Sequence, residues 1–462
     1  MESQLKFICI RQHMFLDQKY VLLLLPNKIT LSQFGKEPKY ILELELHNII
    51  SWQLNHLNQL VSFGIIWNRI EKLFHSTHED LMKLREAIRN QIMFKTVHQL
   101  YKPLSLLGGS NLDELYLCSD LIDNKQFQIK CHAKNQFEDS MSRIYNEIYC
   151  LNKIKSDYVQ SLHEVFTGEN TVYLIQEYLD GVNLNELLNR VTLDKPQILI
   201  IMKQLLTAVK EIHFHNIMHR DLKPTAIVFQ NKDSIEGLKL TDFHLAVPIN
   251  SQINLGDSGT PGYAAPETFK DNYNEKVDIF SVGCIFFKLV TKRDLFYGKT
   301  TNEILKLNRT CKIDLQILQI YKLSQNELNL LKDLLELDPE KRISAESALS
   351  HPYFFNDTIQ EEQLLNNQQQ PLLVQNLLER SNGFFQAKTD NFDKNVEEFL
   401  VDSESPNICA IPIFKVLMKD SILQNLQVRK KSKLKKSETQ EYSQLNFLNH
   451  FQARKSVHQT IV

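Results

Sequence analysis

Three polar motifs follow one another along the middle of this sequence, and their order constrains the fold more than any other feature. Residues 219–224 read HRDLKP, residues 240–244 read LTDFH, and residues 259–267 read GTPGYAAPE. A single tripeptide arises easily by chance, whereas several motifs in a fixed order and at workable spacing do not. The three segments are therefore predicted to belong to one folded unit.

The residue types in these motifs point to phosphate chemistry. Phosphoryl transfer needs placed charges: a lysine on the phosphates, carboxylates on metal and a base near the accepting hydroxyl. The motifs resemble those of eukaryotic serine/threonine protein kinases, and residues 259–267 are most similar to the calcium/calmodulin-dependent branch. The resemblance covers residues 101–354 and implies an α+β bilobal kinase fold with a β-rich N-lobe and an α-rich C-lobe.

The resemblance assigns the catalytic roles to four residues. Lys130 would hold phosphates and form an ion pair with Glu147 from the next helix. Lys134 is the competing lysine, but it leaves too little chain before Glu147 to finish a strand and enter a helix. Asp221 would orient the substrate hydroxyl, and Lys223 would touch the moving phosphate.

The same resemblance implies a site for ATP and magnesium. Gly108 would begin the loop that covers the phosphates, and Glu177 to Leu179 would supply the hinge backbone that bonds adenine. Val228 is a further position expected to contact the nucleotide. Asp242 would hold magnesium across the phosphates.

Other matching positions have structural roles in the family. Asp278 would brace the catalytic loop, and Arg342 would pair with Glu267. The stacked regulatory spine of the family would be formed by Leu151, Leu162, His219 and Phe243.

Five positions depart from the family pattern, and all of them concern nucleotide, phosphates or metal. Backbone N–H groups approach phosphates where no Cβ intervenes, yet Ser110 and Asp113 replace the second and third glycines of the covering loop. Gln128 replaces an alanine that roofs adenine. Ala226 replaces the asparagine that ligates a second magnesium, and a methyl group cannot bind metal. His244 replaces a glycine, and we expect it to be a structural filler rather than a catalytic group.

The departures favour a pseudokinase, or a strongly impaired serine/threonine kinase, that acts as a scaffold or allosteric partner of other proteins. They argue against ATP and magnesium as working cofactors. An active ATP-dependent kinase that phosphorylates protein substrates is the alternative, because Lys130, Glu147, Asp221 and Asp242 are all present. A third interpretation is an adaptor addressed to the membrane or the nucleus.

Regulation by the activation segment depends on Arg220, which usually needs an anionic partner. Three residues before Gly259 stands Gly256, which cannot be phosphorylated, whereas the neighbouring Asp257 carries a permanent charge. A carboxylate carries less charge than a phosphate, so we expect constitutive but partial ordering of the segment. Ser258 is the alternative phosphate acceptor.

Residues 1–95 are predicted to form a separate β domain. Runs of apolar residues indicate strands over Lys19–Leu25, Ile41–Leu46, Ile49–Leu54 and Phe63–Trp67, and helical spacing indicates a helix over His78–Ile92. Several strands followed by one helix resemble a pleckstrin-homology-like domain, a small β-barrel-like unit.

Lipid binding by this domain has little support in the sequence. Some members of that family bind phosphoinositides through a basic cluster, whereas only Arg11 and Lys19 stand in the corresponding region. We therefore expect packing against the kinase domain or a protein partner rather than against lipid.

The remaining residues, 355–462, are rich in Asn and Gln and are predicted to be mostly irregular. Amphipathic pieces at Glu361–Leu378 and Ile413–Leu426 are candidate docking helices. A basic run over Arg429–Lys436 is either a nuclear-import signal, a contact for an anionic surface, or a solvated stretch without function.

The overall charge and the cysteine content indicate which partners and which cellular compartment to expect. Lys and Arg total 53 against 55 for Asp and Glu, so no net field draws the whole chain to nucleic acid. The seven cysteines are scattered and never spaced as C-x-x-C, which favours a reducing compartment. We expect an intracellular, cytoplasmic protein, with nuclear entry through the basic run as the alternative.

Overall fold

The computed structural model of this chain describes residues 4–355 with short gaps. The gaps are residues 14–15, 110–112, 135–138, 250–257, 271–272, 312, 314–317, 319 and 322. The two predicted tail helices and the basic run lie outside the described residues. Among the residues described, no helix is long and apolar enough to span a bilayer.

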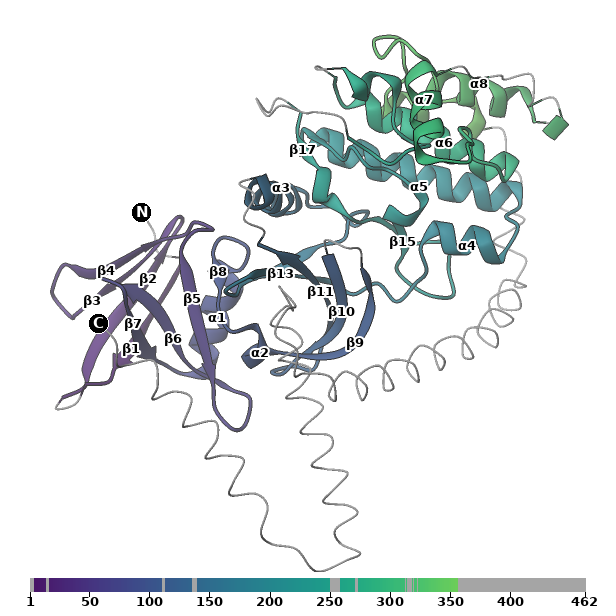
Figure 1. Ribbon diagram of the computed structural model, residues 1–462. Helices are drawn as coiled ribbons and strands as arrows, with labels where there is room; N and C mark the ends of the chain where they lie inside the picture. The colour runs from purple at the N-terminus through teal and green to yellow at the C-terminus, as the bar shows by residue number, and fades with distance from the viewer. Residues whose placement is uncertain are drawn as a thin grey trace, which may run out of the picture. The chain divides into compact units, whose positions relative to one another are not determined.

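Residues 4–95, here called the N-terminal unit, begin with seven antiparallel strands in the neighbour order β4-β3-β2-β1-β7-β6-β5 (Figure 1). Side chains alternate between the two faces of a strand, and one face is buried. In that core Phe74 contacts Tyr20, Tyr40 and Phe63 with ring centroids 5.5, 5.4 and 5.4 Å away. The strands are β1 (Leu5–Arg11), β2 (Gln18–Leu25), β3 (Lys28–Ser32), β4 (Pro38–Glu43), β5 (Ile49–Leu54), β6 (Leu60–Trp67) and β7 (Ile70–His75).

The helix predicted over His78–Ile92 is α1 (His78–Ile88), so the prediction of its end was wrong. Thr77 caps its start, since the threonine Oγ1 accepts a hydrogen bond from the backbone N–H of Asp80 at 3.2 Å. The helix stops because Asn90 adopts a left-handed backbone with φ of 67°, which asparagine tolerates and an α-helix excludes. The short elements β8 (Met93–Phe94) and α2 (Val97–Leu100) follow.

Residues 101–177, the β-rich lobe, form a five-stranded antiparallel sheet in the order β12-β13-β11-β10-β9. One long helix, α3 (Asp139–Lys153), connects β11 to β12. This arrangement places residues of β11 and α3 near one another. The strands are β9 (Tyr101–Gly109), β10 (Asp113–Asp120), β11 (Gln126–Ala133), β12 (Leu162–Thr167) and β13 (Thr171–Glu177).

Residues 180–355, the helical lobe, pack around α5 and α6, which bury apolar side chains along their length. The α-helices are α4 (Leu184–Arg190), α5 (Lys195–Phe214), α6 (Lys276–Thr291), α7 (Thr301–Thr310), α8 (Gln325–Leu334) and α9 (Ala345–Leu349). Short elements between them are β14 (Ile217–Met218), η1 (Pro224–Ala226), β15 (Ile227–Phe229), β16 (Leu238–Leu240), η2 (Phe243–Leu245), β17 (Val247–Pro248), η3 (Pro266–Phe269) and η5 (Pro352–Phe354).

Two predicted braces of the helical lobe are present. The carboxylate of Asp278 accepts hydrogen bonds from the backbone N–H groups of His219 and Arg220 at 2.9 and 2.8 Å. Arg342 forms a buried bidentate pair with Glu267, and the second bond measures 3.2 Å. The first contact fixes the loop that carries residues 219–224.

A buried arginine ties the N-terminal unit to the β-rich lobe. Arg85 of α1 is 4% exposed, and its guanidinium donates to Glu164 of β12 at 2.6 and 2.8 Å and to Asp120 of β10 at 3.1 Å. Burial disfavours the charged guanidinium. The surrounding groups, among which Glu164 has the largest effect, nevertheless raise the pKa of Arg85 above its usual range. Beside these bonds, β8 pairs in parallel with both β5 and β12, so the two sheets are continuous.

Backbone groups add to this junction. The Asn90 side chain donates to the carbonyl of Leu162 at 2.9 Å, and the side chain of Asn152 in α3 donates to the carbonyl of Asn90 at 2.8 Å. The N-terminal unit therefore contacts both the sheet of the β-rich lobe and the end of its helix.

Replacing Arg85 tests this junction. Arg85→Met keeps most of the side-chain stem but leaves two buried carboxylates without their cation, so the free energy of unfolding should fall by about 3–5 kcal/mol. Chemical denaturation followed by circular dichroism measures this loss. Lys83→Met, which breaks an exposed pair with Glu79, is the control and should leave the midpoint unchanged. A midpoint equal to wild type in Arg85→Met would show that the junction is dispensable.

Candidate active site

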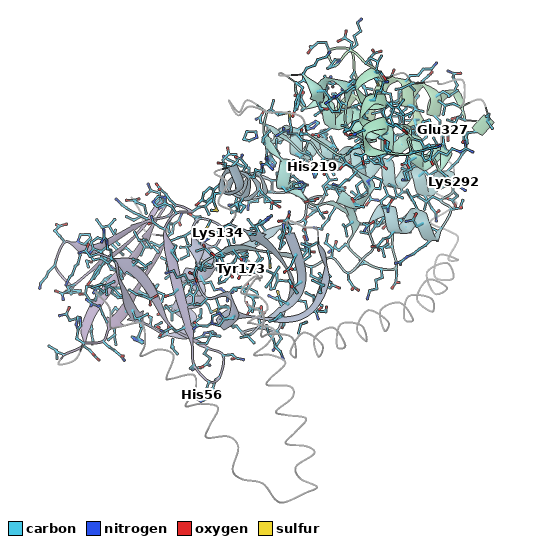
Figure 2. The ribbon with its side chains drawn as sticks, viewed as in Figure 1. His56, Lys134, Tyr173, His219, Lys292 and Glu327 are labelled. Atoms are coloured by element: carbon cyan, nitrogen blue, oxygen red, sulfur yellow. The ribbon has the colours of Figure 1, made fainter. Side chains whose placement is uncertain are left out.

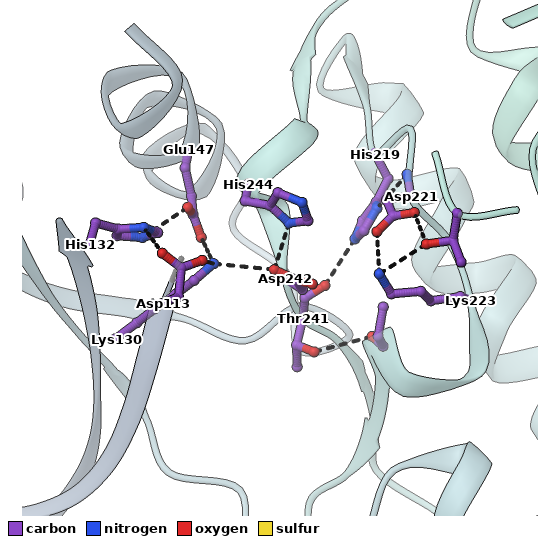
Figure 3. Close-up of polar contacts among 12 residues, drawn as sticks. Asp113, Lys130, His132, Glu147, His219, Asp221, Lys223, Thr241, Asp242 and His244 are labelled. Atoms are coloured by element: carbon purple, nitrogen blue, oxygen red, sulfur yellow. Dashed lines mark hydrogen bonds and ion pairs between the residues drawn. The ribbon is translucent and has the colours of Figure 1, made fainter. Parts of the chain in front are cut away.

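Lys130 lies at the centre of a group of charged side chains (Figure 3). From β11 its Nζ reaches Oε1 of Glu147 in α3 at 2.8 Å, which confirms the predicted ion pair. The same Nζ lies 3.2 Å from Oδ1 of Asp242. The competing lysine, Lys134 (labelled in Figure 2), instead donates to Thr167 Oγ1 and the carbonyl of Gly168, both at 2.7 Å.

A third carboxylate, Asp113, also faces Lys130. Its Oδ2 lies 3.9 Å from Lys130 Nζ, and its Oδ1 lies 2.6 Å from Nδ1 of His132. The other ring nitrogen of His132 lies 3.2 Å from Glu147, an ion-pair distance without the alignment of a hydrogen bond. His132 thus bridges Asp113 and Glu147 beside the lysine (Figure 3).

Reasoning from the sequence missed His132. The spacing of residues in the sequence could have identified it. Residues two apart on a strand face the same side, and His132 follows Lys130 by two residues in β11. A histidine at that position is therefore placed to bond whatever carboxylate surrounds the lysine.

The position of Asp113 depends on a close approach between β9 and β10. A Cβ at Gly109 would lie 2.4 Å from the backbone oxygen of Asp113, so only glycine permits this strand pairing. The predicted phosphate-loop residue Gly108, with φ of 155°, has open space where a Cβ would stand. Gly109, rather than Gly108, is the glycine that holds the two strands together here.

The charges alter one another's protonation. Burial favours neutral Glu147, but the charge of Lys130 and the contact with His132 outweigh it and lower the pKa of Glu147 to about 2. Burial likewise opposes the charged forms of Lys130 and His132. The charge of Glu147 is the main effect that raises the pKa of Lys130 above its usual value. The hydrogen bond with Asp113 is the main effect that raises the pKa of His132.

Asp242 carries a second histidine contact. It has a left-handed backbone with φ of 64° and precedes η2, which brings Nδ1 of His244 within 2.7 Å of its Oδ1. Burial opposes ionisation of Asp242, but the hydrogen bond from His244 and the charge of Lys130 hold its pKa well below the usual range. His244, expected only to fill space, therefore bonds the residue predicted to bind metal.

The catalytic-loop residues bond among themselves. The carboxylate of Asp221 accepts from Lys223 Nζ and, at 2.6 Å, from Thr260 Oγ1, while Lys223 also lies 3.1 Å from that hydroxyl. Ala226 is buried in η1, and its carbonyl accepts the backbone N–H of Thr241 at 2.9 Å. The Ala226 side chain offers no ligand atom near Asp242.

Gln128, which replaces the alanine expected above adenine, contacts a residue of the neighbouring strand β13. Gln128 and Gln176 are paired across β11 and β13, and the amide of Gln128 donates to the Gln176 oxygen at 3.3 Å. Glu177 ends β13, Leu179 is buried just beyond it, and Val228 lies in β15. Glu177 and Leu179 thus lie at and just after the end of β13, whereas Val228 lies in a separate short strand.

Comparison with known proteins decides the family. The family model of the protein kinase domain matches residues 101–354. The chain belongs to the protein kinase family. The probable serine/threonine-protein kinase 2 of Plasmodium falciparum is 32% identical over 263 residues, which are 56% of this chain and 51% of that protein. This kinase chain therefore spans about half the length of that relative, and the closer likeness to the calcium/calmodulin-dependent branch stays a prediction.

The activation segment of this kinase domain is described only in part. Gly256 and Asp257, on which the expectation of constitutive ordering depends, lie outside the described residues. Ser258 bonds Tyr273 through their hydroxyl groups at 2.9 Å, and Arg220 Nε donates to the same tyrosine oxygen at 2.9 Å. Tyr273 thus connects the predicted alternative phosphate acceptor to the arginine of the catalytic loop.

The bridging histidine predicts a pH dependence of stability. The pKa of His132 is raised on folding by Asp113 and Glu147, so its contribution is complete below the ordinary histidine pKa and is lost as pH rises through the folded value. We expect His132→Asn to destabilise the protein more at about pH 5.5 than at about pH 8.5 in urea titrations.

His163 provides a control of opposite sign. Burial, with Arg89 and Arg85 nearby, lowers its pKa to about 4, so its contribution is present at high pH and is lost as pH falls toward that value. His163→Asn should therefore be more destabilising at about pH 8.5 than at about pH 5.5. The same pH trend in both variants would contradict the bridging role of His132.

Proposed function

We propose that this protein kinase domain has lost efficient phosphotransfer and works as a signalling protein through the proteins that it binds, as a scaffold or allosteric partner. The observation that carries the proposal is the position of Asp113. Its carboxylate stands beside Lys130, the lysine that would hold phosphates, and His132 anchors it there.

The phosphates of ATP do not fit this arrangement. Lys130 lies 2.8, 3.2 and 3.9 Å from the oxygens of Glu147, Asp242 and Asp113. A polyphosphate would add negative charge to a site that already holds three carboxylates, and like charges at short range repel by about 1 kcal/mol or more. Binding would first require Asp113 to leave His132.

Adenine and magnesium meet similar obstacles. The Gln128 and Gln176 side chains are bonded to each other, and Gln128 stands at the position where the resemblance expects the alanine that roofs adenine. The side chain of Ala226 supplies no oxygen, and Mg²⁺ prefers oxygen ligands in near-octahedral geometry. Departures at the base, at the phosphates and at the second metal position together support weak or absent binding of magnesium–ATP.

The parts of the domain that maintain its shape are kept. His219 and Phe243, two members of the predicted spine, are both buried and lie with ring centroids 4.7 Å apart. Arg342 and Glu267 remain paired. Retained architecture beside altered nucleotide residues supports a role in protein binding.

One observation favours the alternative, an active serine/threonine kinase. The Lys130–Glu147 pair is formed at 2.8 Å, and Asp221 and Asp242 are both present in the same site. If Asp113 is displaced by the nucleotide, these four groups are the ones that would transfer phosphate to a protein substrate.

We propose that the N-terminal unit is a pleckstrin-homology-like domain. Seven antiparallel strands followed by α1 support this resemblance. We propose that its role is to dock on the kinase domain through Arg85 rather than to bind lipid, within an intracellular, cytoplasmic protein. An adaptor addressed by this unit or by the basic run is the remaining alternative.

The carboxylate of Asp113 is the group to remove. Wild-type protein should show no thermal shift with micromolar magnesium–ATP, whereas Asp113→Ala should gain one, because a ligand that binds only the folded state stabilises it. Glu114→Ala is the matched control, since Glu114 is the adjacent carboxylate but accepts from the Tyr116 hydroxyl at 3.0 Å. Adding Gln128→Ala and Ala226→Asn to Asp113→Ala should increase the shift further.

A clear shift in the wild-type protein at micromolar magnesium–ATP would overturn the proposal and favour the active kinase. The same conclusion would follow if Asp113→Ala and Glu114→Ala behaved alike while both bound the nucleotide.

A further inference from the structure

Three potential metal ligands lie together where the catalytic loop meets η2. Asp221, Asp242 and His244 can each offer one ligand atom, and these atoms all lie within 4.8 Å of one another. The side chains of His244 and Asp242 are 33% and 35% exposed, so an ion in solution can reach them. Figure 3 shows that the three side chains lie in one region of the site.

The spacing suits one ion after a small adjustment. Ligand atoms of a tetrahedral zinc site are about 3.4 Å apart, because each bond is about 2.1 Å long and the angle between bonds is about 109°. The widest separation here is within 4.8 Å, and His244 Nδ1 already lies 2.7 Å from Asp242 Oδ1. The three atoms would therefore approach one another by up to about 1.4 Å to bind one ion.

The types of ligand indicate which ion would bind. Position 226 has lost the amide oxygen expected in a kinase, and position 244 has gained an imidazole nitrogen. Mg²⁺ prefers oxygen ligands, whereas imidazole together with carboxylates suits Zn²⁺ and related transition metals. The two changes together replace a set of oxygen ligands by a mixed set.

We propose that Asp221, Asp242 and His244 bind one Zn²⁺ ion, or a similar divalent transition-metal ion, in the absence of nucleotide. Three protein ligands leave a fourth position for water. The ion would join the catalytic loop to η2 through two carboxylates and one imidazole.

Neighbouring cations limit the affinity. Lys130 lies 3.2 Å from Asp242, and Lys223 forms an ion pair with Asp221. The ion takes the place of the proton between His244 and Asp242 and shares both carboxylates with these lysines. We therefore expect micromolar rather than tighter binding of Zn²⁺.

Calorimetric titration of the full chain with Zn²⁺, without nucleotide, tests the proposal. Wild type should bind one zinc equivalent that His244→Gly binds about 10-fold or more weakly. His47→Gly is the matched control, since His47 lies 3.0 Å from Glu45 on the surface and should retain that equivalent. Zinc bound elsewhere on the chain contributes equally to all variants, so the difference isolates this site.

Asp242→Asn provides a second route if His244→Gly does not fold, and circular dichroism reports which variants are folded. Asp242→Asn should also lose the zinc equivalent. Mg²⁺ at the same concentration should give no comparable heat of binding in the wild type. Equal zinc binding by wild type, His244→Gly and Asp242→Asn would overturn the proposal. Equal binding of Mg²⁺ and Zn²⁺ at this site would do so as well.

Discussion

The ammonium group of Lys130 is buried among three carboxylates, and this concentration of charge determines what the site can accept. Lys130 and Glu147 are 5% and 1% exposed, so neither can lose the other without leaving an unpaired charge out of water. Their pairing fixes α3 against β11. The same pairing holds the site in the geometry of a kinase even where nucleotide residues have changed.

Asp113 and His132 extend that pair into a closed network. A lysine alone would attract phosphates, but the charge of this lysine is already paired within the chain with Glu147, Asp242 and Asp113. His132 keeps Asp113 in place from the same face of β11. The charged groups of this site therefore pair with one another inside the chain. These pairs explain how the domain retains the kinase fold although the residues expected to bind nucleotide have changed.

Strand β10 connects this network to the junction with the N-terminal unit. It begins at Asp113, which faces Lys130 and His132, and ends at Asp120, which accepts from Arg85 of α1. Both ends therefore carry a buried or half-buried carboxylate bound to a cation from another element. Arg85 therefore connects the N-terminal unit directly to β10 and β12.

The sequence predicted the motif-based contacts well, because each depends on residues that kinases share in a fixed order. The Lys130–Glu147 and Glu267–Arg342 pairs and the Asp278 brace are of this kind. His132 and Arg85 were missed, since neither belongs to a motif and each has partners distant in sequence.

Arg85 also shows why the spacing of apolar residues alone does not predict every buried contact. It shares the buried face of α1 with Leu81 and Ile88, where a charged residue is explained only by carboxylates brought from β10 and β12. The early end of α1 depends on the backbone of Asn90, which helical spacing does not report. Such features arise from tertiary contacts that a single sequence does not encode locally.

The most direct test is a crystal structure of the full chain grown with Mg²⁺ and a non-hydrolysable ATP analogue at millimolar concentration. The account predicts that the Asp113 carboxylate remains on His132 beside Lys130 and that no nucleotide phosphate is bound there. Phosphate oxygens on Lys130, with Asp113 displaced and magnesium on Asp242, would contradict it.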